Sequence, residues 1–219
     1  MPAWWNGVVH SESTLPEGLG AALVAAGSRD DPALDELVNA ALSSPDPRHR
    51  VLALRARARR GRVGVAQWRA ALVDPDADVR REALTLLAHD PRPLPSLARA
   101  IVTALDDPDP LVVDAAAFAA GERGCHAAID SLINVASTHD DARCREAAVA
   151  ALGGLGDRRG VATIIAALED KAPVRRRAIV ALANVEGPDV DAALARAATD
   201  RDWQVRAAVE QLAREDRSP

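Results

Sequence analysis

Small and apolar residues recur along this chain at helical spacing, and the whole pattern returns after 30 to 33 residues. An anchor column can be followed through six copies, and residues four and seven positions after each anchor are mostly alanine or leucine. Such spacing places these residues on one face of a helix. A second apolar stretch precedes each anchor, so every copy predicts two helices. The anchors are His49, Val79, Val112, Cys144, Val174 and Val205.

The turn between the two predicted helices is rich in aspartate and proline, as in "DPDADV" from Asp74. Aspartate suits the N-cap of a helix, and proline suits its first turn. Several glycines follow the second helix of a copy, where left-handed caps favour glycine. We expect helix ends at Gly121, Gly124, Gly153, Gly154 and Gly156.

Composition supports an all-α fold, because alanine dominates the apolar residues and only 2% of the chain is aromatic. The net charge of -5 argues against nucleic acid as the partner. Two cysteines give no disulfide framework, and we see no signal peptide and no apolar run of membrane-spanning length. We therefore expect a cytoplasmic monomer that does not enter a membrane.

The motif "DPDADVRREALTLL", from Asp74 to Leu87, resembles the HEAT repeat in its short bacterial form, often called PBS-lyase HEAT-like. The resemblance implies an armadillo-like, right-handed α-solenoid of about six helical hairpins, an α-α superhelix. First helices would form its convex side and second helices its concave side. The solenoid would cover residues 31–214, after an N-terminal segment with a capping helix (1–30) and before a frayed polar tail (215–219).

In that family the acidic turn residue and the arginine after the anchor form a hydrogen-bonded ladder between neighbouring repeats. Val113 replaces the arginine in the third copy, so the ladder would be interrupted there. Arg50 and Arg145 keep the arginine opposite Ser44 and His139. The resemblance pairs Asp74 with Arg80, Glu169 with Arg175, and Asp200 with Arg206.

No catalytic constellation stands out. The HEAT-like deoxyhypusine hydroxylases hold iron with His-Glu pairs, and no histidine here is followed by glutamate. We expect Cys144 to be a buried small hydrophobe, while Cys125 could be exposed with nothing nearby to lower its pKa. We therefore expect no catalytic residue, metal ligand or cofactor.

Outward positions of the second helices would line the concave groove with charges of alternating sign. Such a pattern suits a folded protein partner better than a phosphate backbone, although a solvated face without a ligand fits it equally. The candidate contacts are Arg55, Arg59, Arg81, Phe118 and Arg176.

The tryptophans suggest separate roles. Trp4 and Trp5 precede the repeats and either cover the edge of the first repeat or dock a partner. Trp68 lies in an apolar first-helix column and should be core. Trp203 stands in the predicted turn two residues before Val205, where it can pack on the neighbouring repeat or cap the C-terminal end.

The arginine run "RHRVLALRARARRGR" (48–62) divides into several roles. Arg50 belongs to the ladder, whereas Arg55, Arg59 and Arg62 would form a small basic rim of the groove. Arg57 stands where other copies carry leucine or alanine, which marks an atypical terminal repeat.

These patterns predict a non-catalytic scaffold or adaptor that binds another protein through the concave face. The alternative is a HEAT-like enzyme or enzyme accessory, similar to phycobilin lyases or to deoxyhypusine hydroxylase. DNA binding ranks third.

Overall fold

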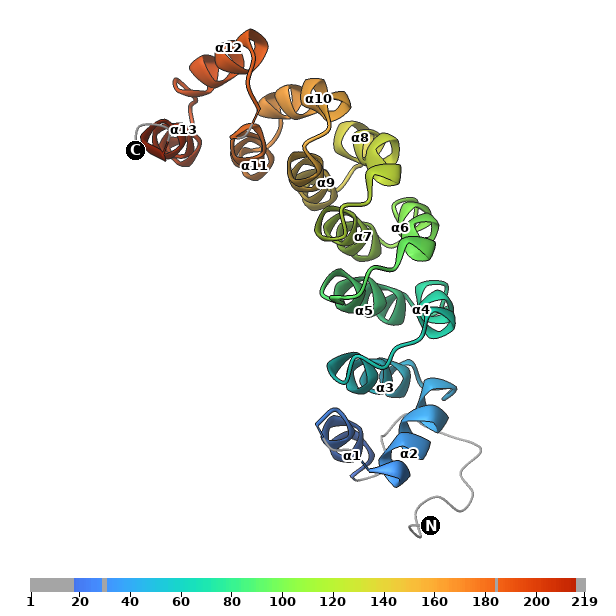
Figure 1. Cartoon of the computed structure of the whole chain (residues 1–219). Coiled ribbons are helices and arrows are strands. Elements are labelled where there is room, and N and C mark those ends of the chain that lie inside the picture. The colour runs from blue at the N-terminus through green and yellow to red at the C-terminus, as the bar shows by residue number, and fades with distance from the viewer. Residues whose placement is uncertain (1–17, 29–30, 184, 216–219) are drawn as a thin grey trace. The chain divides into compact units, whose positions relative to one another are not determined.

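The computed structural model describes residues 18–28, 31–183 and 185–215, and every regular element in these ranges is helical. The chain divides into two compact units, residues 1–86 and 87–219. Trp4 and Trp5 lie outside the described residues. Figure 1 labels the helices in chain order.

The first unit holds a single helix and then paired helices. Helix α1 (Leu19–Ala26) packs on both α2 (Pro32–Leu42) and α3 (Pro47–Arg59). Helix α5 (Ala77–Ala88) includes the last residues of the first unit and the first residues of the second. The paired helices are α2 (Pro32–Leu42) with α3 (Pro47–Arg59), and α4 (Val65–Leu72) with α5 (Ala77–Ala88).

The second unit stacks four further hairpins in two rows (Figure 1). Their second helices pack in order, α7 on α9, α9 on α11 and α11 on α13, while the first helices form the other row. Short 3-10 turns at Pro95–Leu97, His126–Ala128 and Arg158–Gly160 precede first helices, and Ala167–Glu169 follows one. The hairpins are α6 (Ala98–Ala104) with α7 (Pro110–Glu122), α8 (Ile129–Thr138) with α9 (Ala142–Leu155), α10 (Val161–Ala166) with α11 (Ala172–Leu182), and α12 (Pro188–Ala197) with α13 (Trp203–Glu215).

The anchor column forms the core of the hairpins. Val79, Val112, Cys144, Val174 and Val205 are all buried, as are the alanines four residues after the anchors in the first five hairpins. The first and last hairpins depart from this pattern, because His49 and Val209 are only partly buried. The prediction of an all-α solenoid fold built from about six helical hairpins is confirmed.

Aspartates begin most of the second helices. The side chains of Asp46, Asp109 and Asp141 each accept a hydrogen bond from the main-chain N–H two residues later, with proline following the first two. In the fifth hairpin Lys171 stands at this position, and α11 has no side-chain cap. The turn sequence therefore sets where each second helix starts.

The glycines have two different roles, and the expectation that all five end helices is wrong. Gly124 and Gly156 have φ of 59° and 64°, as left-handed helix ends require. Gly121 and Gly153 lie inside α7 and α9, where a Cβ on Gly153 would stand 2.6 Å from Cβ of Ala181 on α11. These two glycines allow neighbouring second helices to approach closely.

Candidate functional site

Ion pairs between successive hairpins form a ladder along the turns. Arg145 donates to both carboxylate oxygens of Asp170 at 2.6 Å, and Arg175 donates to both of Asp200 at 2.8 Å. In the first unit Arg50 donates to Asp74 at 2.8 and 2.6 Å. Each arginine thus joins its own turn to the turn of the next hairpin.

The ladder differs in register from the expected pairs. Within one hairpin the arginine donates to a main-chain carbonyl, as Arg80 does to Asp74 O and Arg206 to Asp200 O, both over 2.7–2.8 Å. The carboxylate of Asp74 serves the preceding hairpin instead. Arg175 likewise bonds Asp170 O, and Asp170 rather than Glu169 accepts from Arg145. The sequence does contain a signal for these pairs, because each ladder arginine precedes its acidic partner by 24 or 25 residues.

At the junction between the third and fourth hairpins, both the arginine and the acid of the ladder are replaced. Val113 replaces the arginine of the third hairpin, and His139 replaces the acid of the fourth. Val113 is buried in α7, and Nδ1 of His139 accepts from the main-chain N–H of Asp141. No unpaired ladder charge remains at this junction.

The exposed stripe of the second helices in the second unit forms the candidate binding surface, which we call the second-helix face. It comprises apolar and charged side chains on α7, α9 and α11. Leu111, Phe118 and Val180 are 38%, 41% and 58% exposed, and the ring of Phe118 lies 5.6 Å from that of His89. The members of this face are Leu111, Asp114, Phe118, Glu146, Arg176 and Val180.

The charged members of the face are partly compensated. Burial raises the pKa of the Asp114 carboxyl, Arg143 opposes this shift, and the carboxylates of Glu146 and Asp141 add to it. Glu146 forms a 3.4 Å ion pair with Arg177, and Arg176 donates to the side-chain oxygen of Gln204. Acidic groups therefore cluster between α7 and α9, with arginines on α11.

The candidate arginines of the first unit are already engaged. Arg55 donates to both oxygens of Glu82 at 2.7 Å, and Arg81 pairs with Asp78 at 2.9 Å. The side chain of Arg59 packs against Gly27, because a Cβ added to this glycine would lie 3.0 Å from Cδ of Arg59. The aliphatic part of Arg59 therefore covers the end of α1. The sequence pattern missed Glu82 as a partner, although it follows Arg55 by 27 residues, close to one repeat.

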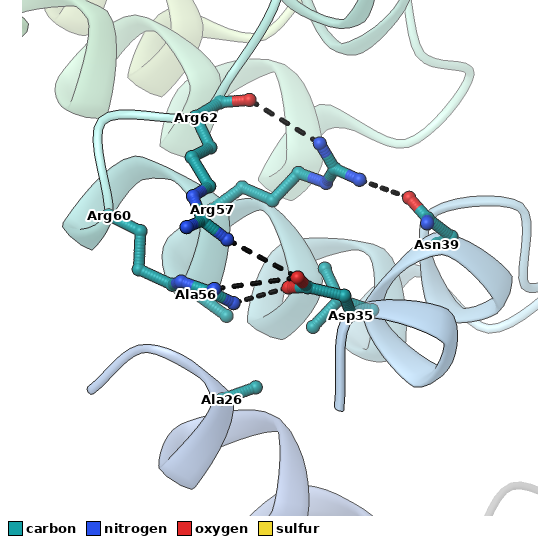
Figure 2. Close-up of a pocket in the computed structure, with 8 residues that line it drawn as sticks. Ala26, Asp35, Asn39, Ala56, Arg57, Arg60 and Arg62 are labelled. Carbon is teal, nitrogen blue, oxygen red and sulfur yellow. Dashed lines mark hydrogen bonds and ion pairs between the residues drawn. The ribbon is translucent and has the colours of Figure 1, made fainter. Parts of the chain in front are cut away.

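Three further arginines of the run turn toward α2, whereas Arg48 pairs with Asp46 in its own turn. Arg60 and Arg62 both bond Asp35, and Arg57 donates to Asn39 (Figure 2). Arg62 therefore does not extend the basic rim as expected. We call Asp35, Asn39, Arg57, Arg60 and Arg62 the arginine pocket.

The tryptophans divide between core and surface. Trp68 on α4 is fully buried, as predicted. Trp203 is 66% exposed at the start of α13, so most of its surface is open to solvent. As the first residue of α13, it does not belong to the buried core that Val205 joins.

Both cysteines are buried, including Cys125, whose exposure the sequence had left open. Burial raises the pKa of both thiols, that of Cys144 to about 11. Sγ of Cys144 donates to Pro110 O at 3.1 Å. At neutral pH both groups are therefore protonated thiols rather than nucleophiles.

Two further findings concern the described residues alone. They contain no cluster of three or more histidine, cysteine or acidic side chains suited to a metal ion. None of their helices combines the length and apolar character that crossing a bilayer requires.

Stacked helical hairpins joined by turn ladders define an all-α repeat protein of the solenoid class. The family model for HEAT repeats matches residues 65–153 and 129–213, which together exceed half of the chain. The chain belongs to the HEAT repeat family. Among curated proteins, none matches the sequence significantly.

Solved structures share the fold at low sequence identity. The Escherichia coli protein YibA superimposes with a TM-score of 0.62 at 17% identity, over 91% of this chain and 75% of YibA. An engineered protein gives 0.57 at 20% identity, over 83% and 95% of the two chains. A designed armadillo repeat protein in complex with the peptide (KR)4 gives 0.54 at 15% identity, over 90% and 98%.

Proposed function

We propose that this protein is a non-catalytic scaffold or adaptor that binds another protein through the second-helix face. The distribution of exposed apolar side chains carries the proposal. In the described part of the second unit, every large hydrophobic residue that is exposed belongs to a second helix: Leu111 and Phe118 on α7, Val180 on α11 and Trp203 on α13. Aromatic and aliphatic groups gathered on one surface are typical of binding sites.

The charges of the face suit a folded partner. Asp114 stands one helical turn before Phe118 on α7 and interacts electrostatically with Glu146 on α9, and Arg176 stands one turn before Val180 on α11. Charges of both signs beside apolar groups provide specificity for a complementary protein surface. The similar designed armadillo repeat protein in complex with a peptide supports the use of this fold for binding polypeptides.

The thiols support a non-catalytic role and a reducing compartment. Cys125 and Cys144 are free and buried, and their raised pKa values keep them protonated. We propose that the chain acts in the cytoplasm as a monomer that meets its partner through the second-helix face. Light scattering after size-exclusion chromatography tests the monomer directly.

A matched pair of valine substitutions tests the binding surface. Val180 on α11 and Val73 at the end of α4 are both exposed, at 58% and 73%, but only Val180 belongs to the second-helix face. The partner is first identified by affinity capture and mass spectrometry from the native cell, and then purified. Val180→Glu should weaken its binding by about tenfold or more, the effect of a central interface residue.

Val73→Glu is the control, because it adds the same charge and should change the dissociation constant by less than about twofold. Equal effects of the two substitutions on the purified complex would contradict the proposal. Iron at one equivalent per chain in the purified protein would also count against a purely scaffolding role.

A further inference from the structure

Asp114 on α7 is a charged residue in an apolar setting. Its side chain is only partly exposed, and the residues on either side of it in α7, Val113 and Ala115, are buried. Leu111 precedes it by three residues and Phe118 follows it by four, and both are exposed. Residues at these spacings are neighbours on one helix face, with Cβ atoms about 5–6 Å apart. The exposed face of α7 therefore presents a carboxylate between two large apolar side chains.

The carboxylate of Asp114 has no hydrogen-bond donor of its own. Among the described residues, no group donates a hydrogen bond to it and no cation forms an ion pair with it. Arg143 attracts it, but the guanidinium of Arg143 donates to Asp141, with Nη2 at 2.7 Å from Oδ2. Arg177 pairs with Glu146 instead, at 3.4 Å. Because a partly buried charge without a hydrogen bond is costly, Asp114 is suited to a donor that comes from another molecule.

The surroundings of Asp114 define the chemistry of that donor. Burial is the main reason that the pKa of its carboxyl is raised, and the carboxylates of Glu146 and Asp141 raise it further. This concentration of negative charge favours a cation over a neutral donor. An arginine guanidinium can give paired hydrogen bonds to a carboxylate while its plane stacks on an aromatic ring, and Phe118 supplies such a ring one helical turn away.

We propose that this part of the second-helix face binds an arginine side chain of the partner protein that is flanked by apolar residues. The guanidinium pairs with Asp114 and stacks on Phe118, while an apolar neighbour of the arginine contacts Leu111. The inference rests on the proposed binding role of the second-helix face and adds the chemistry of the partner. Charge complementarity selects the arginine, and the apolar side chains beside the carboxylate exclude water from the pair.

A fluorine label tests the contact at a single position. The chain contains one phenylalanine, so para-fluorophenylalanine labels Phe118 alone. Fluorine NMR of the labelled full chain is followed during titration with the blocked peptide Leu-Ala-Arg-Ala-Leu, whose extended form places the arginine and both leucines on one side. The matched peptide carries citrulline, a neutral residue of similar shape, in place of arginine.

The arginine peptide should shift the fluorine resonance saturably and bind about tenfold more tightly than the citrulline peptide, because only arginine gives a charge-assisted pair with Asp114. Equal affinities of the two peptides, or no shift with either, would overturn the inference.

Two substitutions locate the preference for arginine. Asp114→Asn should reduce it from about tenfold to about twofold or less, since the carboxylate is lost. The control Asp130→Asn removes an exposed carboxylate of α8, which pairs with Arg159 at 3.3 Å, and should keep the preference. An undiminished preference in Asp114→Asn, or the same loss in both variants, would refute the assignment.

Thermal unfolding provides a measurement that needs no ligand. Asp114→Asn should unfold at the same temperature as the wild type or at a higher one, because it removes a charge that no donor compensates among the described residues. A melting temperature well below that of Asp130→Asn would reveal a partner for Asp114 within the chain and would contradict the inference.

The Val180→Glu test of the purified complex is independent of these results, because Val180 lies on α11 and its effect requires no arginine in the partner. A negative peptide titration together with a complex that Val180→Glu weakens would therefore refute this inference alone and leave the proposed function in place.

Discussion

The ladder arginines show how one side chain serves two hairpins. Arg175 is only 5% exposed, and its guanidinium bonds both the Asp170 carbonyl of its own turn and the Asp200 carboxylate of the next. A nearly buried cation is stable in this position only because fixed acceptors surround it. Loss of one ladder carboxylate should therefore cost more than loss of a surface charge.

Asp170 and Asp140 give a matched test, because both stand four residues before an anchor, but only Asp170 receives a ladder arginine. Asp170→Asn removes the charge opposite Arg145 and should lower the free energy of unfolding by about 1–3 kcal/mol. Asp140→Asn, at the interrupted junction, should change it by less than about 0.5 kcal/mol. Urea unfolding followed by circular dichroism measures both, and similar losses would argue against the ladder.

The ladder also predicts how stability depends on pH. Hydrogen bonds from Arg145 lower the pKa of Asp170, and those from Arg175 lower the pKa of Asp200. Each folded-state pKa lies below the unfolded value of about 3.9, so the stabilisation is complete above that pH and is lost as the pH falls toward the folded pKa.

We expect the melting temperature to be nearly constant from pH 7 to 5 and to fall below about pH 4. The double variant Asp170→Asn with Asp200→Asn should show a shallower fall over the same range. Calorimetry at several pH values checks this slope. Parallel curves for the wild type and the double variant would show that other carboxylates control acid unfolding.

At the scale of the helix, the close contact between α9 and α11 requires a residue without a Cβ at position 153. A Cβ on Gly153 would meet Ala181 at 2.6 Å from its Cβ and 2.7 Å from its Cα, which neither helix can avoid without moving. Gly154, the next residue of α9, has open space at the same position. Adjacent glycines in one helix therefore have different physical roles.

Alanine substitutions separate these roles. Gly153→Ala should destabilise the protein by about 1–3 kcal/mol through overpacking. Gly154→Ala should be neutral or stabilise by up to about 1 kcal/mol, because alanine favours the helix. Chemical unfolding of the two variants provides the comparison, and a stabilised Gly153→Ala would show that the helices separate at little cost.

The helices were largely predictable from sequence, whereas the partners of the charged side chains were not. Anchor spacing and turn chemistry identified the hairpins, because the burial of Val112 or Ala116 depends on periodicity alone. The partner of Arg145 depends on how the next turn is placed, and Asp170 and Glu169 are adjacent candidates in the sequence. The pattern placed Phe118 on the exposed face correctly, but it gave no sign that Arg62 turns to Asp35.

At the scale of the whole molecule, the hairpins of a repeat protein are stabilised mainly by their neighbours. In the second unit α7 buries seven residues, whereas among the described side chains of α13 only Val205 is buried. Val209 and Leu212 stand in the core columns of this hairpin, yet both are only partly buried. Stability should therefore decrease from α7 toward α13.

Hydrogen exchange followed by mass spectrometry tests this gradient and its connection to the ladder. Amides of α7 and α9 should exchange most slowly in the second unit, and those of α13 fastest. Asp170→Asn weakens the junction between α9 and α11, so exchange should accelerate in α10 to α13 while α7 keeps its protection. Asp140→Asn is the control and should leave the pattern unchanged. Equal acceleration in every helix of the unit would instead indicate a single cooperative opening, in which a lost ion pair affects all hairpins alike.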